Sequence, residues 1–226
     1  MKLKAATIFL LALAALFGCT SEAYDSGDGK YSYLTADFAV AHTAAAKTAD
    51  YVVCDNGTKL FLSPLLTVEW AEKADTTYRT LLYYNAPKAS AASNTVEAVA
   101  AIQVPVLRPI DAREVETFLE DPLTVESVWL AENGRYLNLS LLIKTGKADS
   151  DAQGQTVALV LDSIAAQSDG TRCAMTRLYH SQGGVPEYYT SRYYLSIDTN
   201  DFPADALAIE VNTYKGKLTK TISFSK

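Results

Sequence analysis

Few residues of this 226-residue chain have the type and spacing that catalysis requires. A hydrolytic triad needs a nucleophile, a base and a group that orients the base. The two histidines, His42 and His180, are each expected at the exposed end of a β-strand. The sequence contains no Gly-x-Ser-x-Gly, His-Glu-x-x-His or Cys-x-x-Cys motif and no phosphate-binding glycine loop. We therefore expect no catalytic residues, no cofactor and no enzymatic activity.

Two acidic turns, Asp25-Ser26-Gly27-Asp28 and Asp149-Ser150-Asp151, offer the oxygen ligands that calcium prefers. Neither has the EF-hand spacing or the glutamate that closes such a loop. Because acidic turn residues are usually solvated, we expect no metal site at either turn.

The strongest candidate for a binding surface is the stretch Tyr188–Ile197. Alternation along a strand places Tyr193, Leu195 and Ile197 toward the core. It places Tyr188, Arg192 and Tyr194 on the opposite face, as a rigid patch suited to a partner protein or a sugar ring. The alternative, which we favour, is a cross-strand aromatic cluster that stabilises the sheet. Trp70 and Trp129 are expected in core or interdomain packing.

The elements that precede this stretch indicate an OB-like β-barrel over residues 31–108. Short blocks rich in valine, isoleucine and aromatic residues alternate with turn signals, among them Asn56-Gly57, a pair typical of tight hairpins. Five strands are the number that an OB-type barrel needs. The expected strands are Tyr31–Val40, Asp50–Cys54, Lys59–Val68, Thr77–Tyr84 and Thr95–Val106.

A linker over residues 109–122 separates this barrel from a second β domain over residues 123–226. Val115, Phe118 and Leu119 have helical spacing, which predicts one or two helical turns between Pro109 and Pro122. Beyond the linker, clean alternation of apolar and polar residues predicts seven strands, the number typical of an immunoglobulin-like β-sandwich. They are Val125–Leu130, Arg172–His180, Tyr188–Ile197 and the stretches around Leu137–Ile143, Val157–Leu161, Leu207–Val211 and Leu218–Phe224.

The first 18 residues have the features of an export signal. Lys2 and Lys4 precede the apolar run Ala5–Phe17, which would extend only about 20 Å as a helix and is too short to span a bilayer. Leu16-Phe17-Gly18-Cys19 resembles the lipobox of bacterial lipoprotein signals, which implies cleavage after Gly18 and acylation of Cys19. Two or more acyl chains anchor a protein stably in a bilayer. Residues 19–30 are polar and glycine-containing, as expected for a flexible tether.

Charge and the remaining cysteines exclude some classes of protein. The net charge is −6, and we see no basic cluster, which argues against a nucleic-acid partner. Cys54 and Cys173 could form a disulfide in an oxidising envelope, but they fall in different predicted domains. We favour two small buried side chains instead.

Short motifs along the chain resemble NigD-like bacterial lipoproteins in their order and spacing. In the first domain they are Tyr51–Gly57 and Arg79 before Leu81–Tyr84; in the second they are Ser127–Leu130, Tyr136–Leu139, Leu178–His180 and Asn212–Lys217. The resemblance implies an OB-like domain followed by a β-sandwich, an anchor in the envelope of host-associated anaerobes, and a suggested link to bacteriocin immunity. It carries no catalytic residues.

Two classes of function follow from these observations. The first is a non-enzymatic binding module, held through Cys19 on the outer membrane, whose partner is an envelope protein, a toxin or a glycan. The second is a hydrolase of glycan or peptidoglycan, with a pair of carboxylates that sequence spacing does not reveal.

Overall fold

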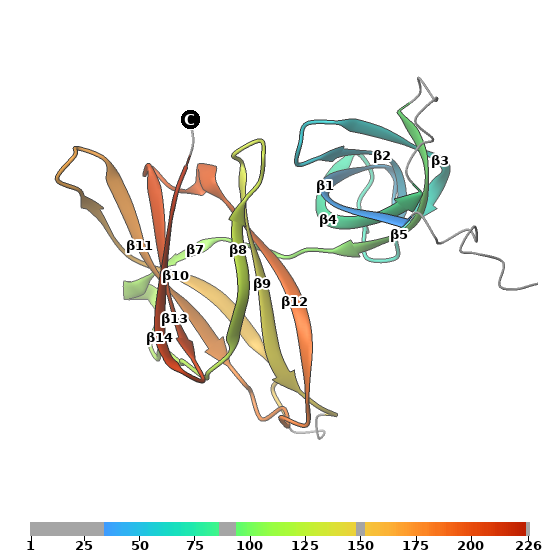
Figure 1. The fold of residues 1–226 in the computed structure, drawn as a ribbon. Helices are drawn as coiled ribbons and strands as arrows, with labels where there is room; N and C mark the ends of the chain where they lie inside the picture. Colours follow the sequence, from blue (N-terminus) through green and yellow to red (C-terminus); the bar gives the residue numbers. More distant parts are fainter. Residues whose placement is uncertain (1–33, 86–93, 148–151, 225–226) are drawn as a thin grey trace, which may run out of the picture. The chain divides into compact units, whose positions relative to one another are not determined.

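The computed structural model of the protein describes residues 34–85, 94–147 and 152–224. Over these ranges the chain forms fourteen β-strands, so the expected all-β class is confirmed (Figure 1). The helices of the described residues are two single 3-10 turns, Ala112–Glu114 and Thr199–Asp201, and neither has the length that a membrane span requires. Thr35–Lys226 is one compact unit, which contains both β domains.

The first five strands close into a barrel, which confirms the OB-like prediction (Figure 1). Their order around the barrel is β1-β2-β3-β5-β4, with β3 and β5 parallel and the consecutive strands β1, β2 and β3 antiparallel. The strands are β1 (Leu34–Ala45), β2 (Thr48–Cys54), β3 (Lys59–Thr67), β4 (Thr76–Asn85) and β5 (Thr95–Gln103).

The predicted hairpin turn joins β2 to β3. Gly57 has a φ of 83°, which a residue with a side chain adopts only with strain. The Asn56 side chain accepts a hydrogen bond from the Thr58 amide at 2.9 Å, and the Gly57 amide donates to the Cys54 carbonyl at 2.8 Å. These bonds fix the chain reversal that places Asp55 at the end of the barrel.

The strand β4 is buried on both faces, unlike an ordinary barrel strand. Thr80, Leu82 and Tyr84 lie on one face, and Leu82 and Tyr84 belong to the barrel core. Arg79 and Leu81 lie on the other face, and they are also buried. Since successive side chains of a strand point to opposite faces, something outside the barrel must cover Arg79 and Leu81.

The chain between the two domains contributes strands to the second one. The predicted strand Thr95–Val106 ends at Gln103 in the structure, and β6 (Val106–Leu107) pairs in parallel with β12. Pro109 begins β7 (Pro109–Asp111), an edge strand parallel to β10, where we expected the start of a linker. Proline is tolerated as the first residue of an edge strand because no ladder bond to its nitrogen is required there.

The second domain is a sandwich of two sheets, as predicted. All seven expected strands are present, and β6 and β7 each extend one sheet. One sheet has the order β14-β13-β11-β10-β7 and the other β6-β12-β9-β8. The strands are β8 (Thr124–Leu130), β9 (Tyr136–Thr145), β10 (Thr156–Ala166), β11 (Arg172–Ser181), β12 (Tyr189–Asp198), β13 (Ala206–Thr213) and β14 (Gly216–Ser223).

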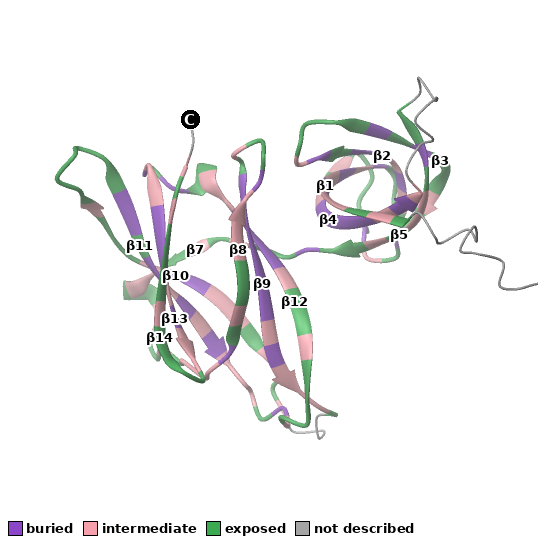
Figure 2. Ribbon diagram, viewed as in Figure 1, coloured by how far each residue is buried: buried purple, intermediate pink, exposed green. Residues whose placement is uncertain are grey.

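Alternating leucines build the sandwich core. Leu137, Leu139, Leu141 and Ile143 of β9 are buried, and they belong to one core cluster with buried residues of the opposite sheet. In Figure 2 much of β9 has the purple colour of buried residues. The same alternation directs Asn138 and Ser140 of β9 to the other face, where they are also buried. The outer face of β9 is therefore covered near this end of the strand.

The helix expected in the linker is much shorter than its pattern indicated. One 3-10 turn forms at Ala112–Glu114, capped by Asp111; Val115 is extended, and residues 115–119 form no further helix. Phe118 packs edge-on against Tyr179 of β11, with ring centroids 5.8 Å apart. Its apolar surface is thus buried on an existing sheet, which stabilises the extended chain at the expense of a helix.

Candidate functional site

A buried arginine joins the barrel to the sandwich. Arg79 of β4 has 1% of its side chain exposed, and its Nη1 and Nη2 donate to the Asp55 carboxylate at 2.5 and 2.6 Å. Two parallel bonds of this kind are among the stronger polar contacts in proteins. A buried charge needs such a partner because desolvation otherwise disfavours it.

Two polar side chains of the sandwich complete the contacts of Arg79. Its Nη2 donates to Asn138 Oδ1 at 3.0 Å, and its Nε donates to Ser196 Oγ at 3.2 Å. The Ser196 hydroxyl donates to Asn138 Oδ1 at 2.7 Å, and Asn138 Nδ2 donates to Asp55 at 3.2 Å. We call Asp55, Arg79, Asn138 and Ser196 the junction network. It explains why the outer faces of β4 and β9 are buried.

Aromatic rings enclose the arginine. The guanidinium carbon of Arg79 lies 4.1 Å from the ring centroid of Tyr136 and 5.4 Å from that of Phe38. Phe38 of β1 packs edge-on against Trp129 of β8 and Tyr194 of β12, each at 5.4 Å between centroids. Trp129 is therefore in interdomain packing, as expected, and Trp70 packs on Tyr78 within the barrel domain.

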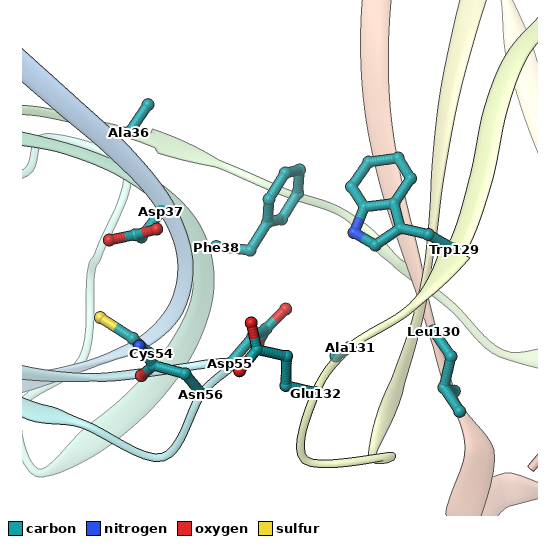
Figure 3. Close-up of a pocket in the computed structure, with 10 residues that line it drawn as sticks. All are labelled: Ala36, Asp37, Phe38, Cys54, Asp55, Asn56, Trp129, Leu130, Ala131 and Glu132. Carbon is teal, nitrogen blue, oxygen red and sulfur yellow. The ribbon is translucent and has the colours of Figure 1, made fainter. Parts of the chain in front are cut away.

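A pocket of about 210 Å³ opens beside the junction network (Figure 3). The rings of Phe38 and Trp129 form its aromatic wall, and Asp37, Asp55 and Glu132 supply carboxylates. In Figure 3 the two rings lie next to each other, edge to face, with Asp55 and Glu132 below them. The other lining residues are Ala36, Cys54, Asn56, Leu130 and Ala131.

The carboxylates and the thiol of this pocket differ in the hydrogen bonds that they make and in their readiness to react. Both oxygens of Asp55 accept hydrogen bonds from Arg79, and Asp37 accepts one from the Tyr84 hydroxyl at 2.7 Å. Burial, with the negative charges of Asp37 and Asp55, raises the pKa of the Cys54 thiol to about 12. The thiol therefore stays protonated near neutral pH and is a poor nucleophile.

Glu132 is the least engaged of the three carboxylates. Its side chain lies on the exposed turn after β8, and among the described residues it makes no hydrogen bond or ion pair. The neighbouring amide of Asn133 donates to the Asp55 carbonyl at 2.9 Å, which holds this turn against the β2–β3 turn. Glu132 is thus positioned at the pocket with its charge available.

Of the predicted tyrosine–arginine surface, only Tyr194 contacts a described residue of this pocket, because Arg192 lies nearer the other end of β12 and Tyr188 precedes that strand. Tyr194 packs on the pocket residue Phe38, while Tyr188 lies before β12 and is 80% exposed. Arg192 forms a bidentate ion pair with Glu126 at 2.5 and 2.6 Å. Tyr193, which we expected on the core side, is 40% exposed. It lies nearer the exposed end of β12 than the buried Leu195 and Ile197.

Neither histidine is at an exposed strand end, so that prediction is wrong. His180 is 1% exposed, because the linker segment 119–121 pairs with β11 and covers it. Its Nδ1 donates to the Asp121 carbonyl at 2.8 Å, and Nε2 has no partner among the described residues. His42 lies within β1, where it stacks on Tyr51 at 4.6 Å and bonds to Asp50 at 2.7 Å.

The cysteines and the acidic turns complete the predicted sites. Cys54 and Cys173 are free and buried, in the barrel core and on β11. Cys19 and both acidic turns, Asp25–Asp28 and Asp149–Asp151, lie outside the described residues. Within the described ranges no group of three or more histidine, cysteine or acidic side chains could hold a metal ion.

Asp55, Arg79 and Asn138 lie within the motifs that resemble NigD-like proteins, but the sequence alone predicts no role for them. A signal was present: Arg79 is a charged residue beside a tyrosine, a threonine and two leucines, in Tyr78-Arg79-Thr80-Leu81-Leu82. Such a residue is buried only with a partner. Identifying the partner required the three-dimensional arrangement, since Ser196 lies 117 residues away in the sequence.

The fold and the junction define an all-β protein in which an OB-like barrel is joined to an immunoglobulin-like sandwich by a buried arginine. No family model matches the sequence, and no curated protein matches it. Solved structures do share the fold. A NigD-like immunity protein from Bacteroides caccae superposes with a TM-score of 0.63 at 20% identity, covering 82% of this chain and 91% of its own.

Two further solved structures share this fold. A candidate toxin-related protein from Parabacteroides distasonis has a TM-score of 0.61 at 15% identity, over 85% of this chain and 93% of its own. A candidate lipoprotein from Bacteroides fragilis has a TM-score of 0.58 at 11% identity, over 85% and 98%. The resemblance to NigD-like proteins is confirmed at the level of the fold.

Proposed function

We propose that the protein is a lipid-anchored, non-enzymatic binding module of the bacterial cell envelope, of the NigD-like type. The pocket beside the junction network carries this proposal. It combines aromatic walls with carboxylates, an arrangement suited to holding a ligand group. Its thiol is held protonated and Asp55 is bound to Arg79, which favours binding over chemistry.

The anchor is proposed from Leu16-Phe17-Gly18-Cys19 and from the candidate lipoprotein of the same fold. Acylated Cys19 would hold the protein on a bilayer, with residues 19–30 as the tether. The outer membrane is the proposed location.

The partner is proposed to be an envelope protein, a toxin or a glycan. Support comes from the names of two proteins with this fold, one an immunity protein and the other toxin-related. The surface of Tyr188, Arg192 and Tyr194 remains the proposed contact face. Tyr194 continues it to the pocket through Phe38.

The anchor is tested by mass spectrometry of the full-length protein extracted from membranes with detergent. We expect a mass that corresponds to cleavage after Gly18 plus acyl chains, and Cys19→Ala should lose both the chains and the membrane fraction. Ser21→Ala is the matched control in the same segment. A wild-type protein that is cleaved but carries no lipid would remove the anchor from the proposal.

The binding function is tested by crosslinking the tagged, lipidated protein in intact envelopes and purifying it. The control changes Tyr188, Arg192 and Tyr194 to alanine together. A partner that is recovered with the wild type, lost in the triple variant and able to recover the protein reciprocally would support the proposal. Equal recovery with both proteins would remove these three residues from the contact face.

A hydrolase acting on envelope glycan or peptidoglycan is the second candidate. The observation that favours it is that Asp37, Asp55 and Glu132 line one pocket, as a carboxylate pair in a cleft would. The soluble domain is residues 20–226, which lack the signal segment and Cys19 and contain the compact unit Thr35–Lys226. Release of product from purified peptidoglycan by this domain, abolished in Glu132→Gln and Asp37→Asn, would establish the hydrolase. If the folded protein releases no product from peptidoglycan, the hydrolase is excluded and the binding module remains the proposal.

A further inference from the structure

The pocket beside the junction network has the composition of a site for a cation. Its lining contains Asp37, Asp55 and Glu132 but no lysine or arginine. Arg79, the nearby cation, is paired with Asp55, so Asp37 and Glu132 carry negative charge without a bound cation among the described residues. The chain as a whole is acidic, at −6, which favours approach of a positive partner.

The aromatic wall strengthens this preference. Cations are attracted to the faces of aromatic rings, most strongly to tryptophan. Phe38 and Trp129 stand at 77° to each other, so their faces point in different directions around the pocket. A cation that enters can therefore approach both a ring and a carboxylate.

The junction network shows the same chemistry already in use within this chain. Arg79 is held by the Asp55 carboxylate and lies over the rings of Tyr136 and Phe38. The adjoining pocket repeats this combination of carboxylate and aromatic ring, with Glu132 and Trp129 in the corresponding roles. The difference is that no side chain of the described residues supplies the cation.

The titration of neighbouring groups agrees with a negative potential here. The negative charges of Asp37 and Asp55 add to burial in raising the pKa of Cys54 to about 12. The pKa of Tyr84 is also raised, by burial and by its hydrogen bond to Asp37. The part of these shifts that comes from Asp37 and Asp55, and not the part that comes from burial, reflects a negative potential that would favour a positive group.

We propose that this pocket binds an arginine or lysine side chain of a basic polypeptide. The inference rests on the proposed function, since it names the chemistry of the partner. The volume, about 210 Å³, is below the range of about 300–1,000 Å³ typical of whole small-molecule sites and fits a single side chain. The contact of Phe38 with Tyr194 connects the pocket to the tyrosine–arginine surface, over which the rest of a polypeptide would lie.

The test is a titration of the isotope-labelled soluble domain, followed by nuclear magnetic resonance, with three probes. They are N-acetyl-arginine amide, a seven-residue peptide whose only charged group is a central arginine, and the same peptide with uncharged citrulline in place of that arginine. The Trp129 indole N–H and the Asn56 amide report on the pocket, and the Trp70 indole is the internal reference. We expect shifts at Trp129 and Asn56 with arginine, tighter binding of the peptide than of the amide, and no saturable shift with citrulline.

The matched variants are Glu132→Gln and Glu116→Gln, which remove one charge each from exposed positions. Since an exposed ion pair contributes about 0.2–1 kcal/mol, Glu132→Gln should lower the affinity for the arginine peptide about 1.5- to 5-fold. Glu116→Gln should leave its affinity unchanged. Unaltered spectra elsewhere would show that both variants are folded.

Three results would overturn the inference: equal binding of citrulline and arginine, equal losses in the two variants, or no saturable shift at Trp129 with any probe. If N-acetyl-arginine amide binds as tightly as the arginine peptide, the bound side chain need not belong to a polypeptide, and that part of the inference is overturned. The envelope crosslinking experiment is independent. If crosslinking recovers a partner but the titration shows that the pocket binds no cation, the proposed function stands and only this inference is overturned.

Discussion

At the scale of single residues, Arg79 has the largest structural consequence for the two-domain chain. It is a charged side chain with 1% exposure, held by the barrel through Asp55 and by the sandwich through Asn138 and Ser196. A pair of this kind adds less to stability than its number of bonds indicates, because desolvation opposes it. Breaking it is costly, however, because the remaining partner is left without a counter-charge.

We therefore expect Arg79→Met to lower the free energy of unfolding by about 3–5 kcal/mol, measured by urea denaturation. Arg113→Met is the matched control, since Arg113 forms a bidentate pair with Asp111 on the exposed surface. It should leave the midpoint nearly unchanged. A small effect of Arg79→Met, comparable to that of the control, would contradict a structural role for the junction network.

The raised pKa of Cys54 predicts a dependence of stability on pH. The ordinary value is 9.0 and the folded value is about 12, so the unfolded chain loses this proton first as the pH rises. The contribution of the Cys54 thiol to the free energy of unfolding is fully present below about pH 9 and is lost between pH 9 and 12. The urea midpoint of the wild type should therefore fall more steeply between pH 8 and 10.5 than that of Cys54→Ala.

The comparison is between the slopes of the urea midpoint against pH in the two proteins. Truncation of a buried side chain lowers the midpoint equally at pH 8 and at pH 10.5, so this cost does not change the slope. Parallel declines of wild type and Cys54→Ala would show that the thiol does not contribute. The raised pKa of Tyr84 acts in the same direction and remains in both proteins.

At the scale of elements, the strands follow the alternation of their side chains, and β9 is the clearest case. Leu137, Leu139 and Leu141 face the sandwich core, while Asn138 faces the barrel and is buried as well. The linker follows its tertiary contacts instead. Phe118 has helical spacing with Val115 and Leu119, yet it packs on β11 from an extended chain.

Leu139→Ala should lower the free energy of unfolding by about 2–5 kcal/mol, since Leu139 is fully buried at the centre of the core. Leu65→Ala makes the same change at a side chain that is 56% exposed, and it should have little effect. Chemical denaturation of the two variants, side by side, provides the test. Similar losses in both would contradict the assignment of the core.

At the scale of the whole molecule, contacts between barrel and sandwich determine whether the two domains unfold together. Phe38 touches Trp129, Tyr194 and Arg79, all on the junction. We expect the wild type to unfold in one calorimetric transition, because neither domain can open without exposing these groups.

Phe38→Ala should broaden or divide that transition, with the van't Hoff enthalpy falling below the calorimetric enthalpy. Phe61→Ala is the matched control, since the Phe61 side chain is 49% exposed on the outer surface of β3. It should leave the ratio of the two enthalpies as in the wild type. A single sharp transition in Phe38→Ala would show that the coupling does not depend on this ring.

The sequence by itself determined the class of fold, the five barrel strands and the seven principal sandwich strands. It did so because strand alternation and turn signals are local, as at Asn56-Gly57 and Leu137–Ile143. Tertiary structure decided the rest. The burial of His180, the placement of β6 and β7 in opposite sheets, and the pairing of Arg79 with Asp55 and Ser196 all depend on contacts between distant segments. Periodicity predicts which face of a strand is apolar, but it does not identify what covers the opposite face. The pocket formed by Phe38, Trp129 and Glu132 lies at such a contact, so only the folded chain reveals it.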